Sequence, residues 1–469
     1  MTQQNSIYEP PLHRAARLGN LAELKQLIAR GANINSRADI ATNSGSFFRQ
    51  LTPLMVAASS CDGATIETLH WLIEHGADIW ARSQGGTTAA WYAAGKGGWL
   101  ESHKCPVMHD RVDRLEYLLN QGLDPNECSD NGRSLLSEAC GVGDRACVSL
   151  LLQRGATAAP QSESAEPQSS YQIPLFCAAE SGSADCVRLI LEVGANPNTK
   201  DDCNSIALMY SGSPEVALVL IDAGTDIHIT NNYGEDALQE ILKDSDRGSE
   251  RFEVARILLD AGADIERRDE YGNTRLYSVA FFLATDAVEF LLNCDVNPHA
   301  QQSEGKTPLH AVCWGADSQD AQHDSQSVVR LIDLLVRVGI GVNTPDVEGN
   351  TPVHEAAFGD GCNVTAIRTL LKHGAEQDLA AADGMTPLML AASQGAIECV
   401  RTLLMAGANS TIADKQGMTA IDHAKKYCET MVGIDKESPN SNFCCEVISK
   451  QALQQGTECL KLLQETTHP

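Results

Sequence analysis

Residues 383–409, DGMTPLMLAASQGAIECVRTLLMAGAN, contain the signals that start and end two consecutive helices. Gly384 permits a turn with a positive φ angle, Thr386 can cap a helix through its side chain, and Pro387 suits the first helical turn. Gly395 then ends this helix. The first half of the stretch therefore predicts a short helix that begins at Pro387.

The second half of the stretch predicts a second helix. Ile397, Val400, Leu403 and Leu404 follow one another at three- and four-residue spacing, which places them on one face of a helix. Gly407 supplies a left-handed C-terminal cap. The chain then leads outward into a hairpin-like finger. Neither helix can bury its apolar face alone, so the pattern predicts units that stack on one another.

The same unit recurs along the chain. Its opening returns at residues 11–13, 52–54, 307–310, 351–354 and 386–388. This recurrence resembles the ankyrin repeat family, whose unit is roughly 33 residues long. The resemblance covers nearly the whole chain and implies an all-α fold, an ankyrin-repeat solenoid of about twelve helix-turn-helix units with β-hairpin-like fingers. We expect residues 1–469 to form one solenoid, closed by a capping helix over residues 446–465.

The composition favours a thin helical core and a basic partner. Hydrophobic residues make up 43% of the 469 residues and aromatic residues only 5%. Because 35 Lys and Arg stand against 62 Asp and Glu, the net charge is −27. Such a surface repels nucleic acid and anionic membranes and attracts a basic protein, although acidity can also serve solubility alone. We therefore expect a monomer that binds a protein with a basic surface, and neither nucleic acid nor membrane.

The sixteen cysteines form no Cys-x-x-Cys motif. Cys140, Cys177 and Cys313 fall at small-residue core positions of the first helix, as expected for buried reduced thiols. The N-terminal residues lack a basic start and an apolar run, and no stretch approaches the length of a membrane span. We expect a cytoplasmic protein without a cofactor.

His13, His310 and His354 occupy one position of three units. The resemblance implies that this imidazole ties the helix start to the backbone of a neighbouring finger, so a structural role is expected rather than a catalytic one. Trp91 stands at the same position of another unit and is expected in the core.

Several segments depart from the repeat. Gly212-Ser213-Pro214 arrives early and predicts a short first helix, and Asn293-Cys294-Asp295-Val296 replaces the usual Gly-Ala turn. Residues 158–170 and 315–327 are polar and are expected to be mobile inserts. The insert 96–111 contains four residues of types that bind zinc: His103, Cys105, His109 and Asp110. Their spacing matches no standard site, so metal or small-ligand binding there is only an alternative, and no metal is assigned.

Large aromatic residues mark the expected binding surface. The resemblance places the finger tips and the residues after the Ala-Ala pair of the first helix on a concave face. Aromatic residues on an acidic surface are typical of partner-binding anchors, whereas the alternative is local packing between first helices. The predicted partner-binding residues are Tyr233, Tyr271, Phe281, Phe282, Trp314 and Phe358, with Trp80 as a further finger residue.

The sequence favours a non-catalytic function. No segment outside the units approaches the size of a domain, and no phosphate-binding loop, nucleophile elbow or His-Glu-x-x-His motif occurs. We predict a protein-protein interaction module that binds its partner along the acidic and aromatic concave face. One specific form is an inhibitor or immunity protein of a basic effector. The alternative is a scaffold or host-directed effector that recruits a cellular protein.

Overall fold

The structure, a computed structural model, describes residues 9–41, 47–60, 63–95, 109–158, 168–244, 248–315, 325–358, 363–437 and 443–467. Helices follow one another in twelve pairs through these residues. In chain order the pairs are α1 (Pro11–Arg17) and α2 (Leu21–Ala29), α3 (Pro53–Ser59) and α4 (Ile66–Glu74), α5 (Ala89–Ala94) and α6 (His109–Asn120), α7 (Leu135–Val142) and α8 (Arg145–Gln153), α9 (Pro174–Glu180) and α10 (Ala184–Glu192), η2 (Ala207–Tyr210) and α11 (Pro214–Asp222), α12 (Ala237–Lys243) and α13 (Glu250–Asp260), α14 (Arg275–Phe281) and α15 (Thr285–Asn293), α16 (Pro308–Gly315) and α17 (Ser325–Arg337), α18 (Pro352–Ala357) and α19 (Val364–Lys372), α20 (Pro387–Ser393) and α21 (Ile397–Met405), and α22 (Ala420–Glu437) and α23 (Phe443–Thr467). A short 3-10 helix, η1 (Ser170–Gln172), precedes α9, and an antiparallel hairpin of β1 (Ala38–Ala41) and β2 (Phe47–Leu51) precedes α3. Within the described part of the chain, no helix is long and apolar enough to cross a membrane.

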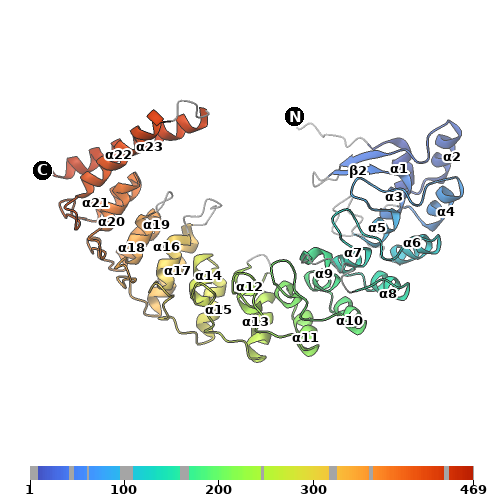
Figure 1. Cartoon of the computed structure of the whole chain (residues 1–469), viewed down its shortest axis with the longest axis horizontal. Coiled ribbons are helices and arrows are strands. Elements are labelled where there is room, and N and C mark those ends of the chain that lie inside the picture. The colour runs from blue at the N-terminus through green and yellow to red at the C-terminus, as the bar shows by residue number, and fades with distance from the viewer. Residues whose placement is uncertain are drawn as a thin grey trace. The chain divides into compact units, whose positions relative to one another are not determined.

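The helix pairs, labelled in Figure 1, belong to two compact units. The N-terminal unit comprises residues 1–232, 236–241 and 247–263, and the C-terminal unit comprises residues 233–235, 242–246 and 264–469. Within the C-terminal unit, each first helix contacts the first helix of the next pair, and each second helix contacts the next second helix. Most neighbouring pairs of the N-terminal unit repeat this arrangement, for example α7 with α9 and α11 with α13. The predicted all-α array of stacked pairs is therefore confirmed, whereas the assignment of residues 1–469 to one solenoid stays a prediction.

The turn residues act as the repeat pattern predicts. The Thr386 hydroxyl accepts a hydrogen bond from the backbone N–H of Met389 at 3.4 Å, and Pro387 occupies the first helical position. Gly384 and Gly407 have φ angles of 89° and 88°, a region that disfavours residues with a Cβ atom. The boundaries of each pair are thus fixed by local chemistry.

The repeated histidines connect neighbouring pairs. His310 accepts a hydrogen bond from the backbone N–H of Thr307 through Nδ1 (3.0 Å) and donates through Nε2 to the carbonyl of Asn350 in the next finger (3.1 Å). His354 bonds in the same way to Thr351 and to the carbonyl of Met385. Burial lowers the pKa of His310 to about 4, although the Asn350 carbonyl partly opposes this effect. The predicted tie between helix start and finger backbone is confirmed.

Two departures from the repeat have direct structural consequences. The early Gly212-Ser213-Pro214 leaves room only for η2, a 3-10 helix of four residues, as predicted. In the pair α14 and α15, Asp295 takes the place of the usual glycine and adopts a φ angle of 59°. That angle is costly for a residue with a side chain.

We expect Asp295→Gly to raise the free energy of unfolding by about 0.5 kcal/mol, because glycine adopts this φ angle without steric conflict. Urea unfolding of the two proteins measures the difference. Asp286→Gly, on the exposed side of helix α15, is the matched control and is expected to destabilise. An Asp295→Gly variant less stable than the parent would contradict the interpretation.

The interpretation of Trp91 as a core residue is wrong. Trp91 is half-buried, whereas the adjacent Tyr92 is only 8% exposed. Phe48 of the hairpin meets the Tyr92 ring edge-on with centroids 6.1 Å apart, and the Thr87 hydroxyl donates to the Tyr92 oxygen at 3.2 Å. The hairpin therefore covers Tyr92, and Trp91 stays at the surface.

The inserts fall largely outside the described residues. Of 158–170 the structure describes residue 158 and residues 168–170, and of 315–327 it describes residue 315 and residues 325–327, the last three of which belong to α17. Their mobility stays a prediction. The range 446–465 lies inside α23, which contacts α20, α21 and α22 and buries Cys459 and Leu463. The three cysteines expected in the core, Cys140, Cys177 and Cys313, are buried free thiols.

Candidate functional site

A cavity of about 740 Å³ opens on the C-terminal unit, and we call it the aromatic cavity. Two tyrosines reach it from the finger tips, two phenylalanines from the end of α14, and one tryptophan from the end of α16. Its aromatic lining consists of Tyr233, Tyr271, Tyr277, Phe281, Phe282 and Trp314. Such side chains supply large contact areas when a partner desolvates them.

A second cavity of about 440 Å³ adjoins the first, and we call it the acidic cavity. The two cavities share Glu304, Lys306 and Trp314. Phe358, which caps the end of α18, adds a second ring to the acidic cavity. The remaining acidic lining residues are Asp346, Glu348, Glu355 and Asp383. Apolar rings and carboxylates therefore lie side by side.

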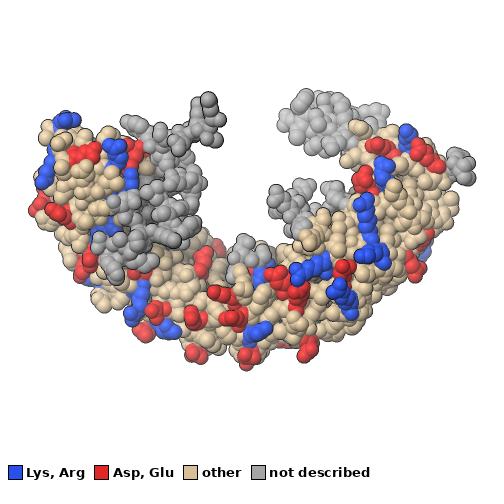
Figure 2. All heavy atoms as spheres, turned by 180° about the vertical axis from the view of Figure 1, so that it is seen from behind, with Lys and Arg blue, Asp and Glu red and all other residues tan. Residues whose placement is uncertain are grey.

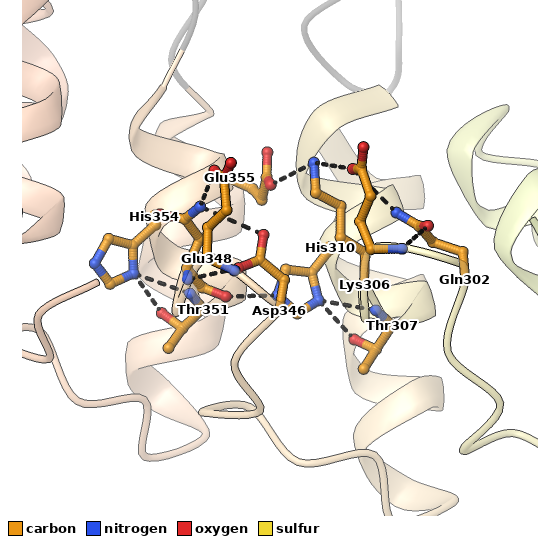
Figure 3. Close-up of polar contacts among 11 residues, drawn as sticks. Gln302, Lys306, Thr307, His310, Asp346, Glu348, Thr351, His354 and Glu355 are labelled. Atoms are coloured by element: carbon orange, nitrogen blue, oxygen red, sulfur yellow. Dashed lines mark hydrogen bonds and ion pairs between the residues drawn. The ribbon is translucent and has the colours of Figure 1, made fainter. Parts of the chain in front are cut away.

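A buried ion pair forms the common edge of the two cavities (Figure 3). The Lys306 ammonium lies 3.0 Å from a carboxylate oxygen of Glu355 and 3.7 Å from one of Glu304. The same ammonium lies 4.8 Å from the centroid of the Trp314 ring, close enough for a cation–π interaction. The Lys306 and Glu355 side chains are only 15% and 6% exposed. Lys306 thus fixes the ring of Trp314 relative to the carboxylates.

Burial and ion pairing act against each other at this edge. Burial tends to lower the pKa of Lys306, but Glu355 and Glu304 outweigh burial and raise it. Burial raises the pKa of Glu355, although Lys306 partly opposes this effect. Burial and the charges of Glu355 and Glu304 also raise the pKa of Tyr277. The direct contact of 3.0 Å means that each of the two groups favours the charged form of the other.

Two of the aspartates hold the fingers rather than face solvent. Asp346 accepts hydrogen bonds from the backbone N–H groups of Glu348 (2.9 Å) and Asn350 (2.7 Å). Asp269, which lines the aromatic cavity, accepts hydrogen bonds from the backbone N–H groups of Tyr271 (2.9 Å) and Asn273 (2.8 Å). These bonds fix the finger turns. At the finger tips, Asp383 likewise accepts from the backbone N–H of Met385 at 2.9 Å, and Glu348 accepts from the side-chain amide of Asn350 at 3.4 Å, but both of these side chains are exposed.

The finger tips of successive pairs are joined through their backbones. The N–H of Val347 donates to the carbonyl of Glu304 at 2.8 Å, and the N–H of Ala382 donates to the carbonyl of Glu348 at 2.7 Å. The N–H of Lys415 donates to the carbonyl of Asp383 at 3.1 Å. From Glu304 onward the tips therefore form a row with a main-chain link at each step.

The structure brings six of the seven predicted residues together. Tyr233, Tyr271, Phe281 and Phe282 line the aromatic cavity, Phe358 lines the acidic cavity, and Trp314 lines both. Trp80 belongs to the N-terminal unit, so it is not part of this site.

Six residues of the site were not predicted from the sequence: Tyr277, Glu304, Lys306, Glu348, Glu355 and Asp383. Three of them, Glu304, Glu348 and Asp383, stand directly before the glycine of a finger turn (the finger glycine), as Tyr233 and Tyr271 do. Aligning the repeats with one another shows that all five residues occupy the same position.

The structure neither supports nor opposes the alternative metal site. Residues 96–108 and the side chains of His109 and Asp110 lie outside what is described. Elsewhere in the described chain, Asp201, Asp202 and Cys203 offer ligand atoms within 4.8 Å of one another. Asp201 is buried and accepts a hydrogen bond from the Tyr210 hydroxyl at 2.8 Å, whereas Asp202 and Cys203 are exposed. Exposed acidic groups are common without a metal ion, so no metal site is assigned.

Comparison with known proteins gives one family. The family described as "Ankyrin repeats (3 copies)" matches residues 12–102, 106–201, 205–301, 276–381, 319–414 and 362–433. The SMC5-SMC6 complex localization factor protein 1 of Bos taurus is 36% identical over 105 residues, which are 22% of this chain and 9% of that protein. The E3 ubiquitin-protein ligase KEG of Arabidopsis thaliana is 25% identical over 281 residues, 58% of this chain and 16% of that protein. The ankyrin repeat and KH domain-containing protein mask-1 of Caenorhabditis elegans is 26% identical over 269 residues, 48% of this chain and 10% of that protein.

These relatives share only a small part of their length with this chain, so the match extends to the repeats and not to the whole proteins. The family matches together span most of the 469 residues. They coincide with the stacked helix pairs, the glycine-capped turns and the bridging histidines described above. The chain therefore belongs to the ankyrin repeat family.

Proposed function

We propose that this protein is a non-catalytic module that holds a partner protein on the aromatic and acidic cavities of its C-terminal unit. Ankyrin repeats are generally non-catalytic and bind other proteins through the surfaces that stacked repeats create. The observation that carries the proposal is a set of five aromatic side chains between 44% and 64% exposed: Tyr233, Tyr271, Phe282, Trp314 and Phe358. Exposed rings gathered at one place mark a binding surface.

Local charge supports a basic partner. Acidic and basic side chains are interspersed over the face drawn in Figure 2, so the chain's charge of −27 alone marks no site. The linings of the two cavities, in contrast, contain seven acidic residues and two lysines. Lys243 pairs with Glu235 at 2.6 Å and Lys306 with Glu355 at 3.0 Å. The acidic excess that remains attracts and orients a basic surface.

A cavity of the N-terminal unit provides a contrast. It has a volume of about 620 Å³ and contains the rings of Phe48, Trp91 and Tyr92. Its charges balance, since Arg49 and Arg133 stand against Asp130 and Glu138. We therefore assign the basic partner to the C-terminal unit.

A specific form of the proposal is that the partner is a basic effector enzyme, for instance a nuclease, which this protein inhibits in the manner of an immunity protein. The acidic lining would then take the place of a polyanionic substrate. The alternative is a scaffold that recruits its partner without blocking it. The enzymatic activity of the purified partner, with and without this protein, separates the two.

We expect the double variant Phe282→Ala/Trp314→Ala to bind the partner about 100-fold more weakly, because exposed anchor residues contribute more than 1 kcal/mol each. The partner is first isolated from the producing cells on the immobilised protein and released with salt, and its dissociation constant is then measured by calorimetry. The far-ultraviolet circular dichroism spectrum and the melting temperature should stay nearly unchanged.

The control is Met405→Ala, which removes an exposed apolar side chain that lines neither cavity and should leave binding intact. Equal affinity of the double variant and the parent would refute the proposed site. A double variant that unfolds would assign the two rings to the core instead.

A further inference from the structure

The finger tips of the C-terminal unit change chemical character along their row. The residue that precedes the finger glycine, or its equivalent, is Tyr233, then Tyr271, then Glu304, Glu348 and Asp383. Backbone hydrogen bonds join the last three tips to their neighbours, and the Ser303 hydroxyl donates to the Tyr271 carbonyl at 3.1 Å. The row therefore has a direction, with aromatic tips first and acidic tips after them.

The first helices α14, α16 and α18, in contrast, all carry aromatic residues at their ends. Phe281 and Phe282 end α14 beside the tyrosine tips, whereas Phe358 ends α18 beside the acidic tips. Trp314 lies between them, with its ring 6.4 Å from that of Phe358. Six of the fourteen residues that line the aromatic cavity are aromatic, and the acidic cavity offers carboxylates together with two rings.

The shared edge already holds a cation of the chain itself. The Lys306 ammonium contacts the Trp314 ring on one side and Glu355 on the other. The buried carboxylate neutralises this ammonium. No Lys or Arg of the described residues pairs with Glu348 or Asp383, and both side chains are exposed. Two carboxylates of the acidic cavity, which Phe358 also lines, therefore have no Lys or Arg partner among the described residues.

From this arrangement we infer that the partner inserts an extended segment with two anchors: a bulky apolar side chain in the aromatic cavity and an arginine in the acidic cavity. This inference rests on the proposed function and adds the chemistry that the site recognises. Arginine fits better than lysine, because a planar guanidinium stacks on a ring and forms paired hydrogen bonds with carboxylates. Glu348 and Asp383 provide the carboxylates, and Phe358 provides the ring.

The first test uses synthetic peptides labelled with fluorescein. Each peptide has about twelve residues, mostly Gly and Ser, with one leucine and one arginine placed about two to six residues apart in both orders, since an extended chain advances about 3.3 Å per residue. Binding is measured by fluorescence anisotropy. We expect the best peptide to lose about tenfold in affinity when citrulline, which has no charge, replaces the arginine, and several-fold when lysine replaces it.

Two variants of the protein assign each anchor to its cavity. In Glu348→Gln/Asp383→Asn, the ratio of the affinity for the arginine peptide to the affinity for the citrulline peptide should fall to about one. In Phe281→Ala/Phe282→Ala, a peptide whose leucine is replaced by alanine should bind as tightly as the leucine peptide. The same variant should still bind the arginine peptide more tightly than the citrulline peptide. The matched control Glu376→Gln/Glu398→Gln removes two exposed carboxylates that line neither cavity and should behave like the parent.

Arginine peptides that bind no more tightly than citrulline peptides would overturn the inference. So would an unchanged ratio in Glu348→Gln/Asp383→Asn. The proposed function would still stand in both cases if Phe282→Ala/Trp314→Ala releases the natural partner. A natural partner that binds both proteins equally would instead remove the proposed function.

Discussion

Lys306→Met is expected to lower the free energy of unfolding by about 3 kcal/mol at neutral pH. The substitution leaves the Glu355 carboxylate, 6% exposed, without the ammonium that lies 3.0 Å from it. An unpaired buried charge typically costs about 3–5 kcal/mol. We expect the lower value, because the Lys306 side chain is 15% exposed and the site is therefore not fully shielded from water. Urea unfolding followed by circular dichroism measures the loss.

The double variant Lys306→Met/Glu355→Gln is the control. Replacing both partners removes the buried charge, so most of the lost stability should return. The loss in the single variant should also shrink on acidification, because burial already raises the pKa of Glu355 and the unpaired carboxyl takes up a proton early. If the double variant is as unstable as the single one, packing of the lysine stem and not the ion pair maintains this edge.

Acidification from pH 7.5 to pH 5 is expected to destabilise the protein through its bridging histidines. The unfolded chain binds a proton at His310 near pH 6.5, whereas the folded protein holds its pKa at about 4. Unfolding therefore takes up protons in this window, and stability falls as the pH decreases from about 6.5 to about 4. The full effect of His310 is up to about 3 kcal/mol. Burial also lowers the pKa of His13 and His354, so both act in the same direction.

Hydrogen bonding gives this effect a second cause. Nδ1 of His310 accepts from the Thr307 N–H, so a proton there would remove the acceptor. The unfolding free energy at pH 7.5, 6.5 and 5 measures the dependence. His310→Gln should be less stable at pH 7.5 and should vary less with pH. The same slope in parent and variant would show that other groups dominate, since Glu127 and Glu355, whose pKa values burial raises, act in the opposite direction.

Much of the fold could be predicted from the sequence, because each helix boundary depends on neighbouring residues. Thr386, Pro387 and Gly407 act through bonds and angles within a few residues of themselves, so their pattern is readable without the structure. The shortened helix before Pro214 follows from the same local logic. The prediction that Trp91 lies in the core was wrong because a hairpin from another part of the sequence covers Tyr92 instead.

The site was predicted only in part. The aromatic residues were visible because large rings are unusual at positions where other repeats carry serine. Glu348 and Asp383 could not be recognised from the sequence, since a single carboxylate in a loop normally faces solvent. Only the stacking of the repeats brings such finger tips into a row. The pair of Lys306 and Glu355 spans two repeats, and burial, which the sequence does not reveal, gives the pair its energy.

The backbone links between finger tips have a consequence for how such a protein changes over time. The bonds from Val347 to Glu304 and from Ala382 to Glu348 use only main-chain atoms. A mutation at a tip therefore exchanges the group offered to a partner without removing the contact that holds the tip in place. Recognition can drift one side chain at a time while the frame keeps its stability, so a lineage can acquire a new partner without passing through a misfolded ancestor.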